Sequence, residues 1–146
     1  MKIVVTCRAL IIHDNKLLMC QHSDPDHGFY NLPGGKLDAG ETLDECMERE
    51  LFEETGIKPV VGKILFINQF INVDNHRIEF FYRIENGADF IKIDPSKASH
   101  GFEIANFVLG DPTDPKYDIK PGFLVARFAQ IVAEGSQFKT EVIVTN

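Results

Sequence analysis

The sequence predicts an α/β fold, in which a β-sheet packs in layers with α-helices. Most of the chain consists of short apolar, β-branched runs separated by turn signals, which is the pattern of β-strands. Two segments, near 42–56 and at 123–134, instead repeat their apolar residues at helical spacing. The 146 residues are enough for a hydrophobic core, and no internal repeat or low-complexity segment divides them. We therefore expect one domain over residues 1–146.

The N-terminal segment is expected to begin with a β-hairpin. Its elements are two apolar strands at 2–12 and 16–21 joined by the turn signal Asp14-Asn15, a polar loop at 22–28, and a short strand at 29–32. The short strand leads into the glycine-rich loop that precedes the first helix.

The first helix is predicted between Thr42 and Gly56. Thr42 and Glu45 fit a capping box, in which each side chain accepts a hydrogen bond from the other residue's backbone amide. Gly56 stands where a left-handed residue ends a helix, and Pro59 follows it. An apolar stripe that recurs every four residues is expected to face the core. It comprises Leu43, Met47 and Leu51.

Further strands and a second helix are expected in the C-terminal half. They begin with a hairpin of strands at 60–73 and 77–85 around Asp74-Asn75, an edge strand formed by Phe90, Ile91 and Ile93, and a strand at 102–109. They continue with a surface loop at 110–122, a helix at 123–134 that ends at Gly135 and covers the sheet, and a strand-like tail at 137–146. A homodimer in which the tail pairs across the interface is left open.

Three glutamates, Glu50, Glu53 and Glu54, are related as i, i+3 and i+4 on the first helix and therefore share one face. Like charges on one surface repel each other, and a bound divalent cation would remove that repulsion. Carboxylate oxygens are ligands for hard cations, so Mg²⁺ or Mn²⁺ is the cation expected. The alternative at this point is a solvated acidic face with Arg49 and Lys58 nearby.

The loop before this helix extends the pattern. Gly35 is followed by five residues, Glu41, seven residues and then Arg49-Glu50-Leu51-Phe52-Glu53-Glu54-Thr55-Gly56-Ile57. Residues 35–57 resemble the Nudix box, G-x5-E-x7-R-E-U-x-E-E-x-G-U with U aliphatic, and match it at every specified position. Leu32-Pro33-Gly34-Gly35 leads into the box as in the wider family. The resemblance implies the Nudix fold, a mixed β-sheet sandwiched between α-helices.

The resemblance also implies roles for the residues of the box. The metal ligands would be Glu50, Glu53, Glu54 and the backbone carbonyl of Gly34. Either Glu50 or Glu54 would in addition act as the base that accepts a proton from water. Arg49 would orient the catalytic glutamates; the ordinary alternative is an ion pair with Glu45 or Glu53, and the two roles are compatible.

Outside the box the candidates are single residues, each with an ordinary alternative as a solvated or core residue. The resemblance implies one more acidic group before the last helix, for which Glu103 is the first candidate and Asp111 the second. Family members often place an arginine for phosphate at the end of the second strand, where this chain has Gln21-His22. The candidates for substrate contact through phosphate are Gly35, Lys36, His22, Arg8, Arg77 and Arg83. Those for stacking on a base are Phe29, Tyr30, Phe70, Phe81 and Phe107.

Composition limits the partners and the compartment. The formal net charge is −7, which disfavours a binder of duplex nucleic acid and requires bound cations for an anionic substrate. Cys7, Cys20 and Cys46 are isolated, with no C-x-x-C pair, so we expect reduced thiols in a cytoplasmic protein. No apolar stretch reaches membrane-spanning length, and no membrane partner is expected.

The expected function is a Mg²⁺- or Mn²⁺-dependent pyrophosphohydrolase that cleaves a nucleoside diphosphate linked to a group X. An ordinary or modified nucleoside triphosphate is the first expectation. The proline typical of ADP-ribose hydrolases and the tyrosine typical of dinucleoside polyphosphate hydrolases are both missing from residues 70–77. The alternatives are hydrolysis of ADP-ribose, nucleotide sugars or dinucleoside polyphosphates, a non-catalytic nucleotide sensor, and an acidic cation-binding scaffold. Removal of an RNA cap is disfavoured by the net charge.

Overall fold

The computed structural model describes residues 1–22, 28–93 and 104–146, and within them two β-sheets and two α-helices. The larger sheet is mixed and has the strand order β4-β1-β6-β5-β8. Its strands are β1 (Ile3–Leu10), β4 (Gly34–Lys36), β5 (Val61–Ile71), β6 (His76–Ile84) and β8 (Glu141–Thr145). The smaller, antiparallel sheet consists of β2 (Ile12–His13), β3 (Lys16–His22) and β7 (Ile104–Gly110), in the order β2-β3-β7.

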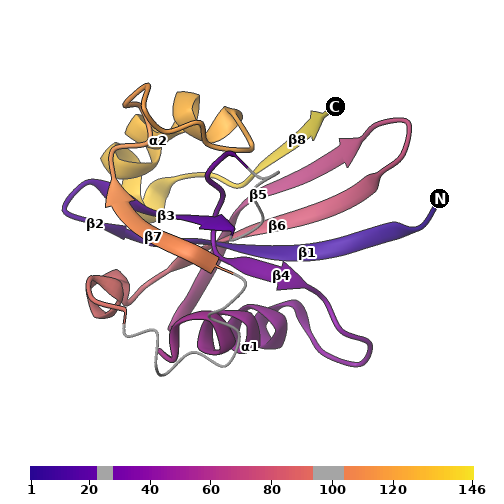
Figure 1. The fold of residues 1–146 in the computed structure, drawn as a ribbon, viewed down its shortest axis with the longest axis horizontal. Coiled ribbons are helices and arrows are strands. Elements are labelled where there is room, and N and C mark those ends of the chain that lie inside the picture. The colour runs from indigo at the N-terminus through magenta and orange to yellow at the C-terminus, as the bar shows by residue number, and fades with distance from the viewer. Residues whose placement is uncertain (23–27, 94–103) are drawn as a thin grey trace.

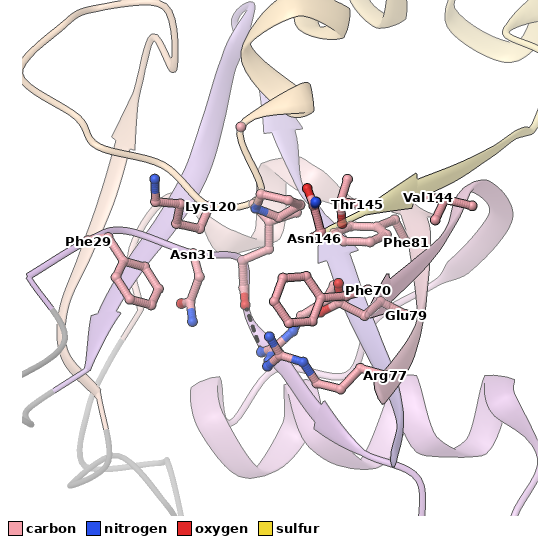
Figure 2. Close-up of a pocket in the computed structure, with 14 residues that line it drawn as sticks. Phe29, Asn31, Phe70, Arg77, Glu79, Phe81, Lys120, Val144, Thr145 and Asn146 are labelled. Carbon is pink, nitrogen blue, oxygen red and sulfur yellow. Dashed lines mark hydrogen bonds between the residues drawn. The ribbon is translucent and has the colours of Figure 1, made fainter. Parts of the chain in front are cut away.

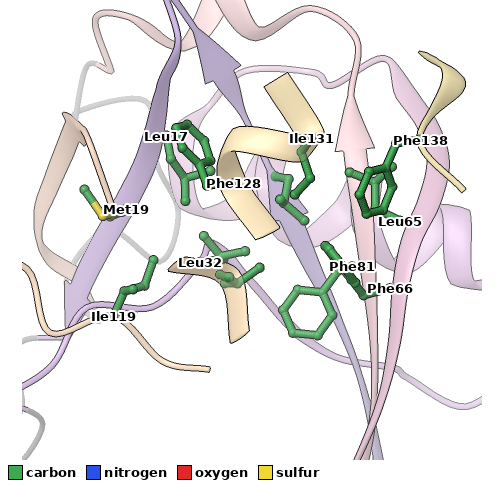
Figure 3. Packing of buried hydrophobic residues seen from close by; sticks show 12 residues of the cluster. Leu17, Met19, Leu32, Leu65, Phe66, Phe81, Ile119, Phe128, Ile131 and Phe138 are labelled. Carbon is green, nitrogen blue, oxygen red and sulfur yellow. The ribbon is translucent and has the colours of Figure 1, made fainter. Parts of the chain in front are cut away.

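The larger sheet lies between the helices α1 (Leu43–Thr55) and α2 (Phe123–Glu134), as Figure 1 shows. Buried side chains of α1, among them Met47 and Leu51, pack with Cys7 of β1 on one face. Phe128 of α2 packs with Phe66 and other buried residues on the opposite face (Figure 3). Each fully buried side chain of this size contributes about 1.5–3 kcal/mol relative to exposure. The expected sandwich of a mixed sheet between helices is therefore confirmed.

The predicted ends of α1 are confirmed in detail. Thr42 is the N-cap, and the reciprocal hydrogen bonds of the capping box join it to Glu45. Gly56 ends the helix in the left-handed conformation with φ 73°, and its N–H donates to the carbonyl of Phe52 at 2.8 Å. These local signals fix where the helix begins and ends, and therefore where its glutamates lie along the sheet.

The first hairpin was predicted too long. Residues 2–12 do not form one arm, because the chain leaves the larger sheet after β1, which pairs with β6 and β4, and enters the smaller sheet at β2. Only the short β2 pairs with β3, around a two-residue turn in which Asp14 and Asn15 have φ of 49° and 57°. Residues 29–32 form single bridges and no strand, and the ladder beside β1 comes from β4.

Phe90, Ile91 and Ile93 do not form an edge strand. A 3₁₀-helix over Gly87–Phe90 follows β6 and buries Phe90 in the core beside α1. Asn86 stabilises this turn, because its side chain accepts from the N–H of Val60 at 2.7 Å and donates to Asp89 at 2.9 Å. The predicted hairpin of β5 and β6, the strand β7 and the helix α2 are confirmed.

The C-terminal tail forms β8, which pairs with β5 in parallel at the edge of the larger sheet. The expected strand is therefore confirmed, and its pairing partner lies within the same chain. A homodimer stays a prediction. Among the residues that the structure describes, no helix is both long and apolar enough to cross a membrane.

Candidate active site

The helix α1 directs Glu50 and Glu54 toward the strand β4, which contains Gly34 and Gly35. The carboxylate of Glu54 accepts a hydrogen bond from the backbone N–H of Gly34 at 3.0 Å. Glu50 lies against Gly35, where a Cβ atom would come within 2.3–2.4 Å of its carboxyl group. Glycine at this position therefore makes room for the Glu50 carboxylate. Glu50 and Glu54 line the same cavity of about 570 Å³.

Arg49 joins the acidic residues of this region. Its Nη1 atom donates to Glu50 Oε1 at 2.9 Å and to Glu53 Oε2 at 3.3 Å, which brings these two carboxylates together. Its Nε and Nη2 atoms donate to the two oxygens of Glu41 at 3.0 and 2.7 Å, a bidentate pair. The expected ion pair with Glu53 is present, but Glu41 replaces Glu45, whose carboxylate is occupied by the capping box.

These contacts shift the pKa values of the acidic groups in opposite directions. Hydrogen bonds from Arg49 lower the pKa of Glu41 to about 2. Burial raises the pKa of Glu50, the negative charge of Glu53 raises it further, and Arg49 opposes both effects. Burial thus makes the charged form of the Glu50 carboxyl group more costly than usual, and the neighbouring Arg49 offsets part of that cost.

The residues around Gly34 offer oxygen donors to a hard divalent cation. Within the described residues, no three Asp, Glu, His or Cys side chains converge into a ready-made metal site. The carbonyl of Gly34 accepts from Arg8 Nη1 at 3.4 Å, and a carbonyl oxygen has a second lone pair. The carboxylates of Glu50 and Glu54 line the same cavity as Gly34, and Arg49 joins the carboxylate of Glu53 to that of Glu50. Carboxylate and carbonyl oxygens are donors of the type that Mg²⁺ and Mn²⁺ prefer. The chemistry of the residues therefore fits such a cation.

Figure 2 shows a second cavity, of about 760 Å³. It shares Arg8 and Arg77 with the first cavity. Three of the five aromatic candidates line this larger cavity, namely Phe29, Phe70 and Phe81. The guanidinium of Arg77 lies 4.8 Å from the centre of the Phe70 ring. An elongated ligand can therefore extend from the glutamates past two cations to an aromatic surface.

Of the other candidates for substrate contact, some line one of the two cavities and some do not. Gly35 and Lys36 line the smaller cavity with Glu50. Tyr30 and Phe107 lie outside both cavities, because Tyr30 packs edge-on against Tyr117 at 5.3 Å and Phe107 packs against the core beside α1. Arg83 also lies outside both cavities.

Of the three remaining acidic or basic candidates, the structure places the side chain of Asp111 alone. Asp111 is exposed and accepts hydrogen bonds from the backbone and side chain of Thr113, which is a local turn. Glu103 lies outside the described residues. His22 ends β3, where its backbone pairs with Ile104, and its side chain is not described.

Sequence reasoning missed a hydrogen-bonded polar group at the larger cavity, of which Glu79 and Thr145 line the cavity. It comprises Asn68 of β5, Glu79 of β6 and Thr145 of β8. Glu79 alternates with the two predicted candidates Arg77 and Phe81, so the period of two residues along β6 places all three on one face. That alternation was the available signal.

Known proteins resemble this chain in sequence and in fold. Residues 3–109 match the family model of the NUDIX domain. An ADP-ribose pyrophosphatase of Methanocaldococcus jannaschii is 31% identical over 106 residues, which cover 70% of this chain and 63% of that protein. An NAD-capped RNA hydrolase NudC of Vibrio atlanticus is 49% identical over 45 residues, which cover 31% of this chain and 17% of that protein.

The fold is shared with a MutT NUDIX hydrolase from Burkholderia pseudomallei. Its crystal structure superimposes with a TM-score of 0.71 at 20% identity and covers 90% of this chain and 99% of that chain. At this identity the likeness concerns the fold. The sequence matches span less than two thirds of the length of either curated relative.

Proposed function

Because this chain belongs to the Nudix family, we propose that it is a divalent-cation-dependent hydrolase of phosphoanhydride bonds in a nucleoside diphosphate linked to a group X. One observation supports this most strongly. The cavity lined by Glu50 and Glu54 meets the aromatic cavity at Arg8 and Arg77. The carboxylates can bind a metal ion, the two arginines can bind phosphate, and the aromatic surface can bind a base. These three parts follow one another in the order in which such a substrate presents its own parts.

The residues that would hold Mg²⁺ or Mn²⁺ are Glu50, Glu53, Glu54 and the carbonyl of Gly34. When bound, the cation supplies neutralisation of phosphate charge and a lower pKa for water. Arg8 and Arg77 are placed to neutralise phosphate charge from the other side. Either Glu50, which Arg49 orients, or Glu54, which the N–H of Gly34 orients, accepts the proton of the attacking water. The products are a nucleoside monophosphate and phosphate, pyrophosphate or the phosphate of X.

An ordinary or modified nucleoside triphosphate is the substrate that we propose first. The relative from Methanocaldococcus jannaschii, named as an ADP-ribose pyrophosphatase, favours ADP-ribose as the second candidate. We also propose a cytoplasmic location, since the three cysteines are free, as in a reducing compartment. Size-exclusion chromatography with light scattering would test the predicted homodimer.

The test is a screen for released phosphate and pyrophosphate with Mg²⁺ over nucleoside triphosphates, ADP-ribose, nucleotide sugars and dinucleoside polyphosphates. The wild type is compared with Glu50→Gln and with Glu48→Gln, a matched change at an exposed position of the same helix. We expect release from one substrate class, a loss of about 100-fold or more in Glu50→Gln, and no loss in Glu48→Gln. Nucleotide binding with no release from any class would favour a non-catalytic sensor instead.

A further inference from the structure

A hydrogen-bonded polar group lies on the inner face of the larger sheet, where three strands meet. Asn68 Nδ2 donates to Glu79 Oε2 at 2.9 Å, and the amide of Asn68 exchanges hydrogen bonds with Thr145 Oγ1 at 3.0 and 3.1 Å. The pairing of β5 with β6 and with β8 places these residues side by side, since Asn68 pairs with Glu79 and Thr145 with Phe70. Backbone pairing therefore fixes the position of the Glu79 carboxylate.

The hydrogen bonds that Glu79 receives within the protein do not offset the free-energy cost of burying its carboxylate. Its exposed fraction is 7%, and that of Asn68 is 0%. A buried carboxylate is costly unless it is paired or hydrogen-bonded, and it can accept about four hydrogen bonds. Among the described residues Glu79 receives one, from Asn68. Since Glu79 lines the larger cavity, its remaining acceptor capacity is directed at whatever occupies that cavity.

The surroundings of Glu79 indicate which part of a ligand would reach it. Phe70 and Phe81, which flank Glu79 in Figure 2, give the cavity an aromatic wall. Arg77 lies at the boundary with the smaller cavity, and its buried Nε atom has no hydrogen-bond partner in the described part of the chain. An anionic floor repels phosphate, whereas the arginines attract it. Phosphates are therefore expected toward Arg77, and an uncharged group that donates hydrogen bonds toward Glu79.

We propose that Glu79 is a specificity-determining residue that accepts hydrogen bonds from a nucleobase with two adjacent N–H donors, which is the guanine type. This inference rests on the proposed function and names its substrate class as guanine nucleoside polyphosphates. Guanine presents N1–H and the 2-amino group side by side, and a carboxylate accepts from both. Adenine and cytosine present an amino group beside a ring nitrogen that is an acceptor. The lone pair of that ring nitrogen is repelled by a carboxylate. Uracil presents one N–H between two carbonyl oxygens.

The first experiment needs no variant. Calorimetric titration of the wild type with GDP, IDP, ADP and 2′-deoxy-GDP in the presence of Mg²⁺ compares ligands that differ in single groups. IDP lacks only the 2-amino donor of GDP, and 2′-deoxy-GDP lacks only a ribose hydroxyl. We expect GDP to bind about tenfold or more tightly than IDP and ADP, and 2′-deoxy-GDP to bind like GDP. A preference that follows the ribose hydroxyl and ignores the base would overturn the proposal.

The second experiment changes the acceptor itself. Glu79→Gln keeps the shape and one acceptor oxygen for Asn68, but it replaces the other oxygen with a donor. We expect the ratio of GDP to IDP affinity to fall toward one, while the matched variant Glu85→Gln, at an exposed position beyond the end of β6, keeps the wild-type ratio. An unchanged ratio in a folded Glu79→Gln protein contradicts the assignment.

The two proposals fail in different ways. Selective binding of GDP without hydrolysis of any substrate would overturn the proposed function and leave the role of Glu79 intact. Hydrolysis of nucleoside triphosphates at equal efficiency for all bases would overturn the role of Glu79 and leave the proposed function intact. Thr145→Val adds a check on positioning, since loss of its hydrogen bonds to Asn68 should weaken the guanine preference less than Glu79→Gln does.

Discussion

Arg49 is the residue around which the carboxylates of α1 are arranged. It pairs with Glu41 through two parallel hydrogen bonds and bridges Glu50 and Glu53 with a third nitrogen. A lysine has one compact ammonium group and cannot make this fork. We predict that Arg49→Lys loses about 2 kcal/mol of unfolding free energy. This corresponds to a fall of roughly 4–8 °C in the melting temperature.

Arg127→Lys is the control for this change, and thermal unfolding is the measurement. Arg127 Nε also contacts both oxygens of a carboxylate, that of Glu141, at 3.1 and 3.0 Å. That pair is more exposed, at 40% and 31%, so screening by water leaves it little net energy. Equal effects of the two substitutions would mean that Arg49 acts as an ordinary surface cation.

The lowered pKa of Glu41 leads to a predicted dependence of the protein's stability on pH. Arg49 lowers its pKa in the folded protein to about 2, below the ordinary value of 4.5. A carboxylate with a lowered folded pKa stabilises the protein above the ordinary value, and this contribution is lost as the pH falls through the folded pKa. We predict that Glu41→Gln melts below the wild type at pH 7 and that the gap closes between pH 4.5 and about 2. Melting curves across this range, beside Glu48→Gln, measure it. A gap that stays constant would contradict the assigned cause.

At the scale of elements, the sequence was sufficient where the signals were local. The ends of α1 follow from Thr42 and Gly56, and the grouping of the glutamates follows from one-turn spacing along the helix. Local signals could not locate the division between β1 and β2, because it depends on which strands lie beside each of them. The turn after Asn86 likewise involves a distant partner, because the side chain of Asn86 accepts a hydrogen bond from the N–H of Val60, 26 positions earlier in the chain.

The same distinction separates the site residues that were predicted from those that were missed. Glu50, Glu53 and Glu54 belong to one helix, so their proximity is visible in the sequence. Asn68, Glu79 and Thr145 come from three strands, and the hydrogen bonds among them depend on a register that spans 77 positions of the chain. Alternation along β6 identifies the face of Glu79, but only the paired strands show what lies beside it.

The contact between α1 and β4 leads to the prediction of a substitution that lowers activity and leaves the stability of the fold nearly unchanged. Gly35→Ala places a methyl group where the Glu50 carboxylate lies, and that carboxylate is the flexible end of its side chain. We predict that Glu50 turns away, that the melting temperature changes by less than about 4 °C, and that hydrolysis falls by about tenfold or more. Gly28→Ala is the control, because a Cβ atom there meets nothing within 4 Å. Full activity of Gly35→Ala would show that the position of Glu50 against Gly35 does not matter.

At the scale of the whole molecule, the two cavities explain how a chain of net charge −7 can accept a polyanion. Carboxylates are concentrated at the end lined by Glu50 and Glu54, and Arg8 and Arg77 stand between this end and the aromatic cavity. The acidic end repels phosphate until a cation is bound there, whereas the arginines attract it throughout. Cation and substrate are therefore expected to bind with positive coupling.

The cation site itself is testable by thermal unfolding, without measuring activity. A ligand that binds only the folded protein raises the unfolding free energy by about 1.4 kcal/mol at ten times its dissociation constant. For a chain of this size we predict a rise of roughly 3–6 °C with Mg²⁺ or Mn²⁺, reversed by a chelator. Glu50→Gln should lose most of this rise, and Glu48→Gln should keep it, because only Glu50 lines the cavity with Glu54. Sodium chloride at matched ionic strength controls for screening of the net charge. An equal rise in sodium chloride, or an unchanged rise in Glu50→Gln, would mean that the stabilisation comes from the acidic surface in general and not from a cation held by the helix α1.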